Sequence, residues 1–175
     1  AQRQAEVKYT PDKIRRFQNH GVIEPYYRIN GVNPDYSKLL QKGIPGLREE
    51  LQSVDLAEAD DKKRATVTSM LGALDILVRV INQYAVYARD LSDECVHEES
   101  KAELLHMATA LETISDSKPT TFREAVQLIH LFSLLSGTGN YGRLDVCLGD
   151  FLVRDLENGE LTEELAHQLM ESFWL

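Results

Sequence analysis

The most restrictive feature of the sequence is a long amphipathic pattern between residues 59 and 91. Its apolar positions recur at three- and four-residue steps, as one face of an α-helix requires. They are Val67, Met70, Leu71, Leu74, Leu77, Val78, Ile81, Tyr84, Ala85 and Ala88. The spacing predicts a long central helix.

A second strong helix signal lies at residues 121–135. Thr121 and Glu124 have capping-box spacing, in which the hydroxyl serves one free amide and the carboxylate reaches back to another. The residues that follow are apolar around most of a helix circumference, so we expect this helix to be buried on more than one side, with Ile129 and Phe132 nearly inaccessible.

Shorter helices are expected along the rest of the chain. A Thr10-Pro11 start predicts one to about residue 20. Two more are predicted at 35–42 and 47–54, separated by Gly43-Ile-Pro-Gly46, and others at 99–114, up to Leu156, and after Thr162. The last of these is expected to bury Leu165, Leu169, Met170, Phe173 and Trp174.

Residues 143–148 are the best strand candidate, so the predicted fold is mainly α, with at most one or two short strands near 143–148 in a single region 1–175. A lone strand cannot satisfy its backbone amides. The last predicted helix also ends on its most apolar turn. Both features suggest a fragment, or a chain that assembles onto a larger one.

Composition excludes several classes of partner. The chain has 175 residues, 43% of them hydrophobic, and a formal charge of -9, which argues against nucleic acid and anionic membranes. No uninterrupted apolar run approaches the ~20 residues of a membrane span, and the polar start lacks a signal peptide's apolar segment. We therefore expect a cytoplasmic protein. Two cysteines without CxxC spacing and scattered histidines predict neither a disulfide nor a metal site.

Five segments then appear in a recognisable order. They read N-P-D-Y-S-K-L-L-Q-K-G from Asn33, P-T-T-F-R-E-A from Pro119, G-R-L-D from Gly142, an acidic turn from Asp155, and E-S-F-W from Glu171. This series resembles the glycyl radical enzymes of the pyruvate formate-lyase superfamily. The resemblance covers about residues 11–175.

The resemblance implies that this chain is the helical N-terminal part of a ten-stranded α/β barrel. In such enzymes an activating enzyme that uses S-adenosylmethionine makes a glycyl radical on one central loop, and a cysteine on another becomes a thiyl. Neither loop has a counterpart here, so no catalytic residue is assigned and no cofactor is expected to be bound. The chain alone should be inactive. The implied partners are a small-molecule substrate, the remainder of the barrel, the radical-activating enzyme and a second copy in a homodimer.

Candidate substrate-binding residues also follow from the resemblance. The glycine-rich loop 137–142 would enter the barrel interior, which places Thr138 and Asn140 at the substrate. Many dehydratases of the family present His-Ser here. Gly137-Thr138 departs from that pattern and argues against a polyol dehydratase of the glycerol type. A phosphate loop is the other interpretation, but the segment follows a helix and lacks a GK[ST] ending.

The remaining candidates are Asp145, Arg28 and Asn30. Arg143 and Asp145 would share one strand face, either as an internal ion pair or with Asp145 contacting substrate. Arg28 and Asn30 lie near the position of a substrate-facing His in several relatives. Arg28 could hold a substrate carboxylate in a bidentate manner, or could be a solvated loop residue.

The predicted parent is an anaerobic lyase, a dehydratase or a formate acyltransferase. The alternative is a non-catalytic helical module that docks onto a larger partner chain.

Overall fold

The computed structural model describes residues 33–138 and 140–174, and every regular element in these ranges is an α-helix. The predicted helix at 11–20 and the candidates Arg28 and Asn30 lie outside the described residues. The helices are α3 (Tyr36–Gln52), α4 (Asp61–Glu94), α5 (Glu98–Asp116), α6 (Phe122–Ser136), α7 (Leu144–Glu157) and α8 (Glu163–Trp174).

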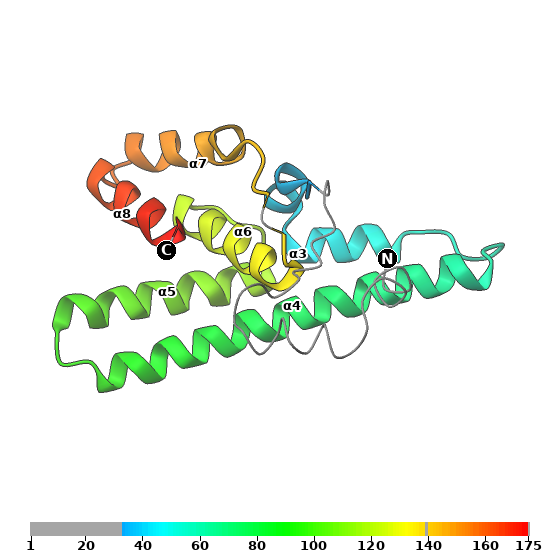
Figure 1. Ribbon diagram of the computed structural model, residues 1–175, viewed down its shortest axis with the longest axis horizontal. Helices are drawn as coiled ribbons and strands as arrows, with labels where there is room; N and C mark the ends of the chain where they lie inside the picture. The colour runs from blue at the N-terminus through cyan, green and yellow to red at the C-terminus, as the bar shows by residue number, and fades with distance from the viewer. Residues whose placement is uncertain (1–32, 139, 175) are drawn as a thin grey trace, which may run out of the picture. The chain divides into compact units, whose positions relative to one another are not determined.

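The helices pack around α6. Figure 1 shows α4 and α5 side by side as an antiparallel pair, with α6 over them, α3 beside α4, and α7 and α8 on the far side of α6. The core is one cluster drawn from all six helices. Its completely inaccessible members include Ile81 of α4, Ile114 of α5 and Ile129 of α6.

Helix α4 confirms the long amphipathic pattern. It begins where the Asp60 carboxylate accepts a hydrogen bond from the Lys63 amide at 2.7 Å. Its buried face comprises Val67, Leu74, Leu77, Ile81, Ala85, Ala88 and Ser92. Two residues of the predicted face are more exposed than expected: Met70 is 50% and Tyr84 45% accessible.

Helix α6 begins as predicted. The Glu124 amide donates to Thr121 Oγ1 at 3.2 Å, and the Glu124 carboxylate accepts from the Thr121 amide at 3.1 Å, which completes the capping box. Ile129 is fully buried, as expected, but Phe132 is only half-buried. Leu134 and Leu135 near the helix end are exposed, so the burial of α6 weakens toward its C-terminus.

The predicted break between residues 42 and 47 is a kink inside α3. Gly43 has φ +64° within an otherwise helical segment, and Pro45 follows it in the next turn. Pro has no amide to donate back along the helix. The kink therefore joins the two predicted short helices into one bent element.

The strand predicted at 143–148 is wrong, because these residues form the start of α7. Leu144, Cys147, Leu148 and Phe151 fall at helical spacing and all pack on the core. Continued through Leu152 and Leu156, this period buries one face of a helix. A short alternating run was thus the first turn of a longer helical pattern.

Helix α8 follows the predicted turn, where Gly159 has φ +72°. The Leu165 amide donates to Thr162 Oγ1 at 3.2 Å, so the predicted cap is confirmed. Phe173 is buried and Leu165, Leu169 and Met170 are half-buried, but Trp174 is 64% exposed, contrary to prediction.

Helix α4 is long and apolar enough to cross a bilayer by length and composition. It nevertheless carries Asp75 and Arg79 near its middle, and Asp75 accepts a hydrogen bond from Arg48 of α3 at 2.6 Å. Its apolar face packs on α3, α5 and α6.

Candidate functional site

The candidate residues Thr138, Asn140 and Asp145 lie along the connection between α6 and α7, residues 137–143, here called the α6–α7 loop, and at the start of α7. Gly137 ends α6 in the left-handed conformation, at φ +64°, which suits a residue without Cβ. The Thr138 amide donates to the Ser133 carbonyl at 3.1 Å, and Thr138 Oγ1 lies 2.8 Å from Ser136 Oγ. Thr138 is therefore fixed at the end of α6.

Asn140 ties the α6–α7 loop to the segment before α3. Its Nδ2 donates to Asn33 Oδ1, and its Oδ1 accepts from the Gly142 amide at 3.0 Å. Both ends of the amide are thus engaged, and the side chain is exposed. Asn33 is a partner that sequence reasoning missed, because 107 residues separate the two side chains.

Tyr141 anchors the same loop in an aromatic cluster. Its ring is stacked on Tyr36 with centroids 6.4 Å apart, and it meets Phe173 at 4.8 Å and Trp174 at 5.5 Å, edge to face. The loop is thereby held against α3 and α8. Sequence reasoning missed this role, although Tyr141 stands directly before the G-R-L-D motif.

Tyr36 and Ser133 form a buried hydroxyl pair near the loop. The Tyr36 Oη lies 2.7 Å from Ser133 Oγ, and burial raises the pKa of Tyr36 although the Ser133 hydrogen bond lowers it. The pair joins α3 to the last turn of α6, which leads into the loop.

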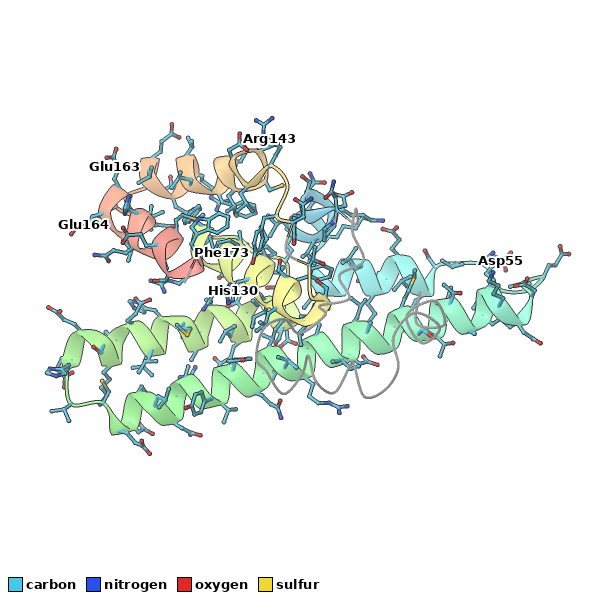
Figure 2. The ribbon with its side chains drawn as sticks, in the orientation of Figure 1. Asp55, His130, Arg143, Glu163, Glu164 and Phe173 are labelled. Atoms are coloured by element: carbon cyan, nitrogen blue, oxygen red, sulfur yellow. The ribbon has the colours of Figure 1, made fainter. Side chains whose placement is uncertain are left out.

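The ion pair predicted between Arg143 and Asp145 exists, but its predicted burial on a strand is wrong. Arg143 Nη2 lies 2.6 Å from Asp145 Oδ2 and Nε lies 2.9 Å from Oδ1. The hydrogen bond from Arg143 lowers the pKa of Asp145 to about 2. The side chains are 75% and 66% exposed, and Figure 2 shows Arg143 pointing away from the other helices.

A separate groove of about 380 Å³ lies among α4, α5, α6 and α8. His130 and Phe173, both labelled in Figure 2, line this groove and meet edge to face with ring centroids 5.6 Å apart. Arg123 and Glu103 pair at one side at 2.9 Å, and Gln127 Oε1 is buried without a hydrogen-bond partner. Thr138, Asn140 and Asp145 are not among its lining residues.

Within residues 33–138 and 140–174, no cluster of three or more His, Cys, Asp or Glu side chains could hold a metal ion. Cys147 lies on α7 with Sγ 3.3 Å from Ser37 Oγ, and Cys95 caps the end of α4. Both cysteines therefore belong to helices or helix ends.

Comparison with known proteins places this architecture in a family. The family described as pyruvate formate lyase-like matches residues 2–175. The trans-4-hydroxy-L-proline dehydratase of Clostridioides difficile is 32% identical over 144 residues, which is 78% of this chain and 18% of that protein. The isethionate sulfite-lyase of Oleidesulfovibrio alaskensis is 32% identical over 154 residues, covering 81% of this chain and 19% of the relative.

A solved structure has the same fold. The Roseburia inulinivorans protein studied for 1,2-propanediol dehydration superposes with a TM-score of 0.76 at 23% identity, over 82% of this chain and 18% of the other. The chain thus spans about a fifth of the length of its relatives. Because the family match covers nearly every residue and agrees with the order of the five motifs, the chain belongs to the pyruvate formate lyase-like family of glycyl radical enzymes.

Proposed function

We propose that the protein carrying this chain is a glycyl radical lyase or dehydratase that acts on a small organic substrate in the cytoplasm. The observation that carries the proposal is the family match over residues 2–175, joined to relatives named as a dehydratase and a sulfite-lyase. A formate acyltransferase is the less supported member of the same class, because neither of these two relatives is named as one.

In this proposal the chain is a helical layer outside the barrel, and it is inactive alone. The reactive glycyl radical, made by an activating enzyme with S-adenosylmethionine, belongs to the remainder of the barrel. The role of residues 33–138 and 140–174 is to bind and position the substrate. Helices α6 and α7 hold the α6–α7 loop, and the loop presents side chains to the substrate. The exposed surface of Arg143, Asp145 and Trp174 then faces the remainder of the barrel.

Thr138 and Asn140 are the proposed substrate contacts, and Asp145, Arg28 and Asn30 complete the candidate set. Support for Thr138 comes from its half-buried position on a glycine-capped helix end, where its hydroxyl is already held by Ser136. A hydroxyl fixed in this way can exchange hydrogen bonds with a substrate hydroxyl or carboxylate at little entropic cost. Asn140, engaged at both ends of its amide, orders the loop around it.

Activation of the full-length protein tests the proposed function. Anaerobic incubation with its activating enzyme and S-adenosylmethionine should give a glycyl doublet in electron paramagnetic resonance, and the 175-residue chain alone should give none. Hydroxyproline and isethionate, the substrates in the names of the two relatives, are the first to assay. A full-length protein that stays silent while a relative is activated in parallel would favour the non-catalytic module instead.

The role of Thr138 is tested in the activated enzyme. Thr138→Val removes a hydroxyl at nearly constant volume, and we expect kcat/KM to fall about tenfold, as the loss of one substrate hydrogen bond predicts. Thr109→Val, at an exposed position of α5, is the matched control and should leave turnover unchanged. Equal turnover in the two variants would remove Thr138 from the site.

A further inference from the structure

Tyr141, in the α6–α7 loop, contacts three aromatic rings that come from two different helices. It stacks on Tyr36 of α3 with ring centroids 6.4 Å apart. From α8, Phe173 meets it edge to face at 4.8 Å and Trp174 at 5.5 Å. Offset-stacked and edge-to-face pairs at these separations are the favoured geometries of aromatic rings. Contacts from two helices therefore fix both the position and the tilt of the Tyr141 ring.

Two of these partners are themselves held by the core. Tyr36 is 2% and Phe173 6% exposed, and both belong to the core cluster. The Tyr36 hydroxyl lies 2.7 Å from Ser133 Oγ of α6. The Phe173 ring meets His130, also of α6, at 5.6 Å. Tyr141 thus rests on side chains that cannot shift without disturbing a close-packed interior.

The other contacts of the α6–α7 loop constrain it less. The Asn140 amide bonds to Asn33 and to Gly142, but all three residues are exposed, so water competes for these hydrogen bonds. The hydrogen bond of the Thr138 hydroxyl is exposed as well. Among the described residues of the loop, Tyr141 is the one whose side chain packs on the core cluster. Its ring is therefore the main constraint on the path of the loop.

This ring stands next to the proposed substrate contacts. Tyr141 directly follows Asn140, and Thr138 lies three residues before it. A misplacement of about 1 Å in a substrate contact can lower a rate about a hundredfold. A loop held by exposed hydrogen bonds alone would sample such displacements, so the ring of Tyr141 is in the place where it can prevent them.

We propose that Tyr141 is a positioning residue for the substrate. Its ring, held by the aromatic side chains of α3 and α8, fixes the α6–α7 loop and thereby the places of Thr138 and Asn140. This inference rests on the proposed function and deepens it, because it gives the last turn of α8 a part in substrate binding. The ring carries the role and the hydroxyl does not, since all three contacts are made between rings.

Steady-state kinetics of the activated full-length enzyme test this role. Tyr141→Ala removes the ring, and kcat/KM should fall about a hundredfold, mainly through a higher KM, because the substrate must then order the loop as it binds. Tyr141→Phe keeps every ring contact and should retain a kcat/KM within about threefold of wild type. Tyr87→Ala, at a ring of α4 that is 60% exposed, is the matched control and should change neither kcat nor KM.

The link from Tyr141 to Thr138 is tested by a double variant. In Tyr141→Ala the Thr138 hydroxyl is already out of place, so adding Thr138→Val should lower kcat/KM by less than about threefold, against about tenfold in the wild-type background. A role of Tyr141 in folding alone would leave the two effects independent. Independent effects, or a Tyr141→Phe enzyme as impaired as Tyr141→Ala, would overturn the proposal.

Hydrogen exchange of the full-length protein before activation distinguishes a failure of this inference from a failure of the proposed function. The amides of Thr138 and Gly142, which are hydrogen-bonded in the loop, should exchange at least about tenfold faster in Tyr141→Ala than in Tyr141→Phe or wild type. Tyr141→Leu keeps apolar bulk without an aromatic ring, and takes the place of the alanine variant if that variant does not fold. Unchanged exchange overturns the positioning role. Faster exchange in a protein whose wild type forms no glycyl radical would establish the hold of the ring on the loop, and would overturn its role toward the substrate together with the proposed function.

Discussion

Asp155 is the buried charge on which the junction of α6 and α7 depends. Its carboxylate accepts from the Phe122 amide at 2.6 Å, in the first turn of α6, and from Arg154 at 2.8 Å. The side chain is 4% exposed. A negative charge at a helix N-terminus is favourable, and Phe122 has no intrahelical partner for its amide.

We therefore expect Asp155→Ala to lower the free energy of unfolding by about 2–3 kcal/mol, because the Phe122 amide loses a charged acceptor in a buried place. Asp155→Asn keeps an acceptor oxygen and should cost less. Asp150→Ala, at an exposed position of the same helix, should stay within about 0.5 kcal/mol of wild type in urea melts. Equal losses at 150 and 155 would contradict this account.

Tyr36 gives the fold a dependence on alkaline pH. Burial raises its pKa, so the folded chain keeps the phenol proton at a pH where the unfolded chain releases it. The unfolded state then binds fewer protons, and stability falls as pH rises above about 10. The contribution is fully present below that pH.

Tyr36→Phe removes this dependence together with the hydrogen bond to Ser133. At pH 8 it should cost about 1 kcal/mol, and the difference from wild type should shrink between pH 10 and 11. Urea melts of both proteins at about pH 8 and about pH 11 measure this difference in the free energy of unfolding. Tyr87→Phe, at an exposed ring, should cost less than about 0.5 kcal/mol at pH 8. A difference that grows at high pH would show that Tyr36 ionises readily in the folded state.

The role of a single residue could be predicted from the sequence where that role depends only on neighbours within one helical turn. The Thr121–Glu124 capping box and the Thr162 cap depend on spacing within one turn, and both are confirmed. Burial at an element's edge depends on its neighbours. Phe132 was predicted to be nearly inaccessible, but its ring packs edge to face on Tyr36 at one side and is half-buried.

At the scale of elements, Gly43 determines the bend of α3. Its φ of +64° is costly for any residue with a Cβ, and a Cβ built there would lie 2.6 Å from the Lys118 backbone. The kink thus brings α3 close to the segment between α5 and α6. No other residue fits both requirements.

Gly43→Ala should lower the free energy of unfolding by about 2–4 kcal/mol, through left-handed strain and the displacement of Lys118. Gly72→Ala in α4 is the matched control, because nothing lies within 4 Å of its Cβ direction and alanine favours a helix. The control should be as stable as wild type or up to about 1 kcal/mol more stable. Chemical denaturation of both variants decides whether the kink is required.

The elements themselves were largely predictable because the helical period is long and regular. The exception, residues 143–148, is short enough that alternation and helical spacing both fit it, and the helix is recognised only when the pattern is followed to Leu156. The same error placed Arg143 and Asp145 on a buried strand. In the helix they stand before and within the first turn, exposed to solvent.

At the scale of the whole molecule, the mainly helical class and the family were predicted from the sequence. The arrangement of helices around α6 was not, because it follows from contacts between residues far apart in the chain. The same holds for the candidate site. The α6–α7 loop was predicted from its glycines, but its partners Asn33 and Tyr36 come before α4 in the sequence, so spacing along the chain gives no sign of these contacts. Thr138 and Asn140 remain proposed substrate contacts.

The described helices should unfold together, because their largest buried side chains meet in one cluster. Circular dichroism is dominated by the long α4 and α5, whereas fluorescence reports Trp174, the single tryptophan, in α8. Ile129 of α6 is fully buried and belongs to the core cluster to which α4, α5 and α8 also contribute. In urea both signals of the 175-residue chain should therefore change with one midpoint.

Ile129→Ala should move both midpoints by the same amount, with a loss of about 2–5 kcal/mol in the free energy of unfolding, since it opens a cavity in the cluster to which all six described helices contribute. Val96→Ala, 88% exposed between α4 and α5, should move neither. Two separate midpoints in the wild type would mean that α8 and the α6–α7 loop form a cooperative unit of their own. In that case Ile129→Ala should shift only the circular dichroism signal, and the proposed substrate-facing loop would not depend on the helical core for its position.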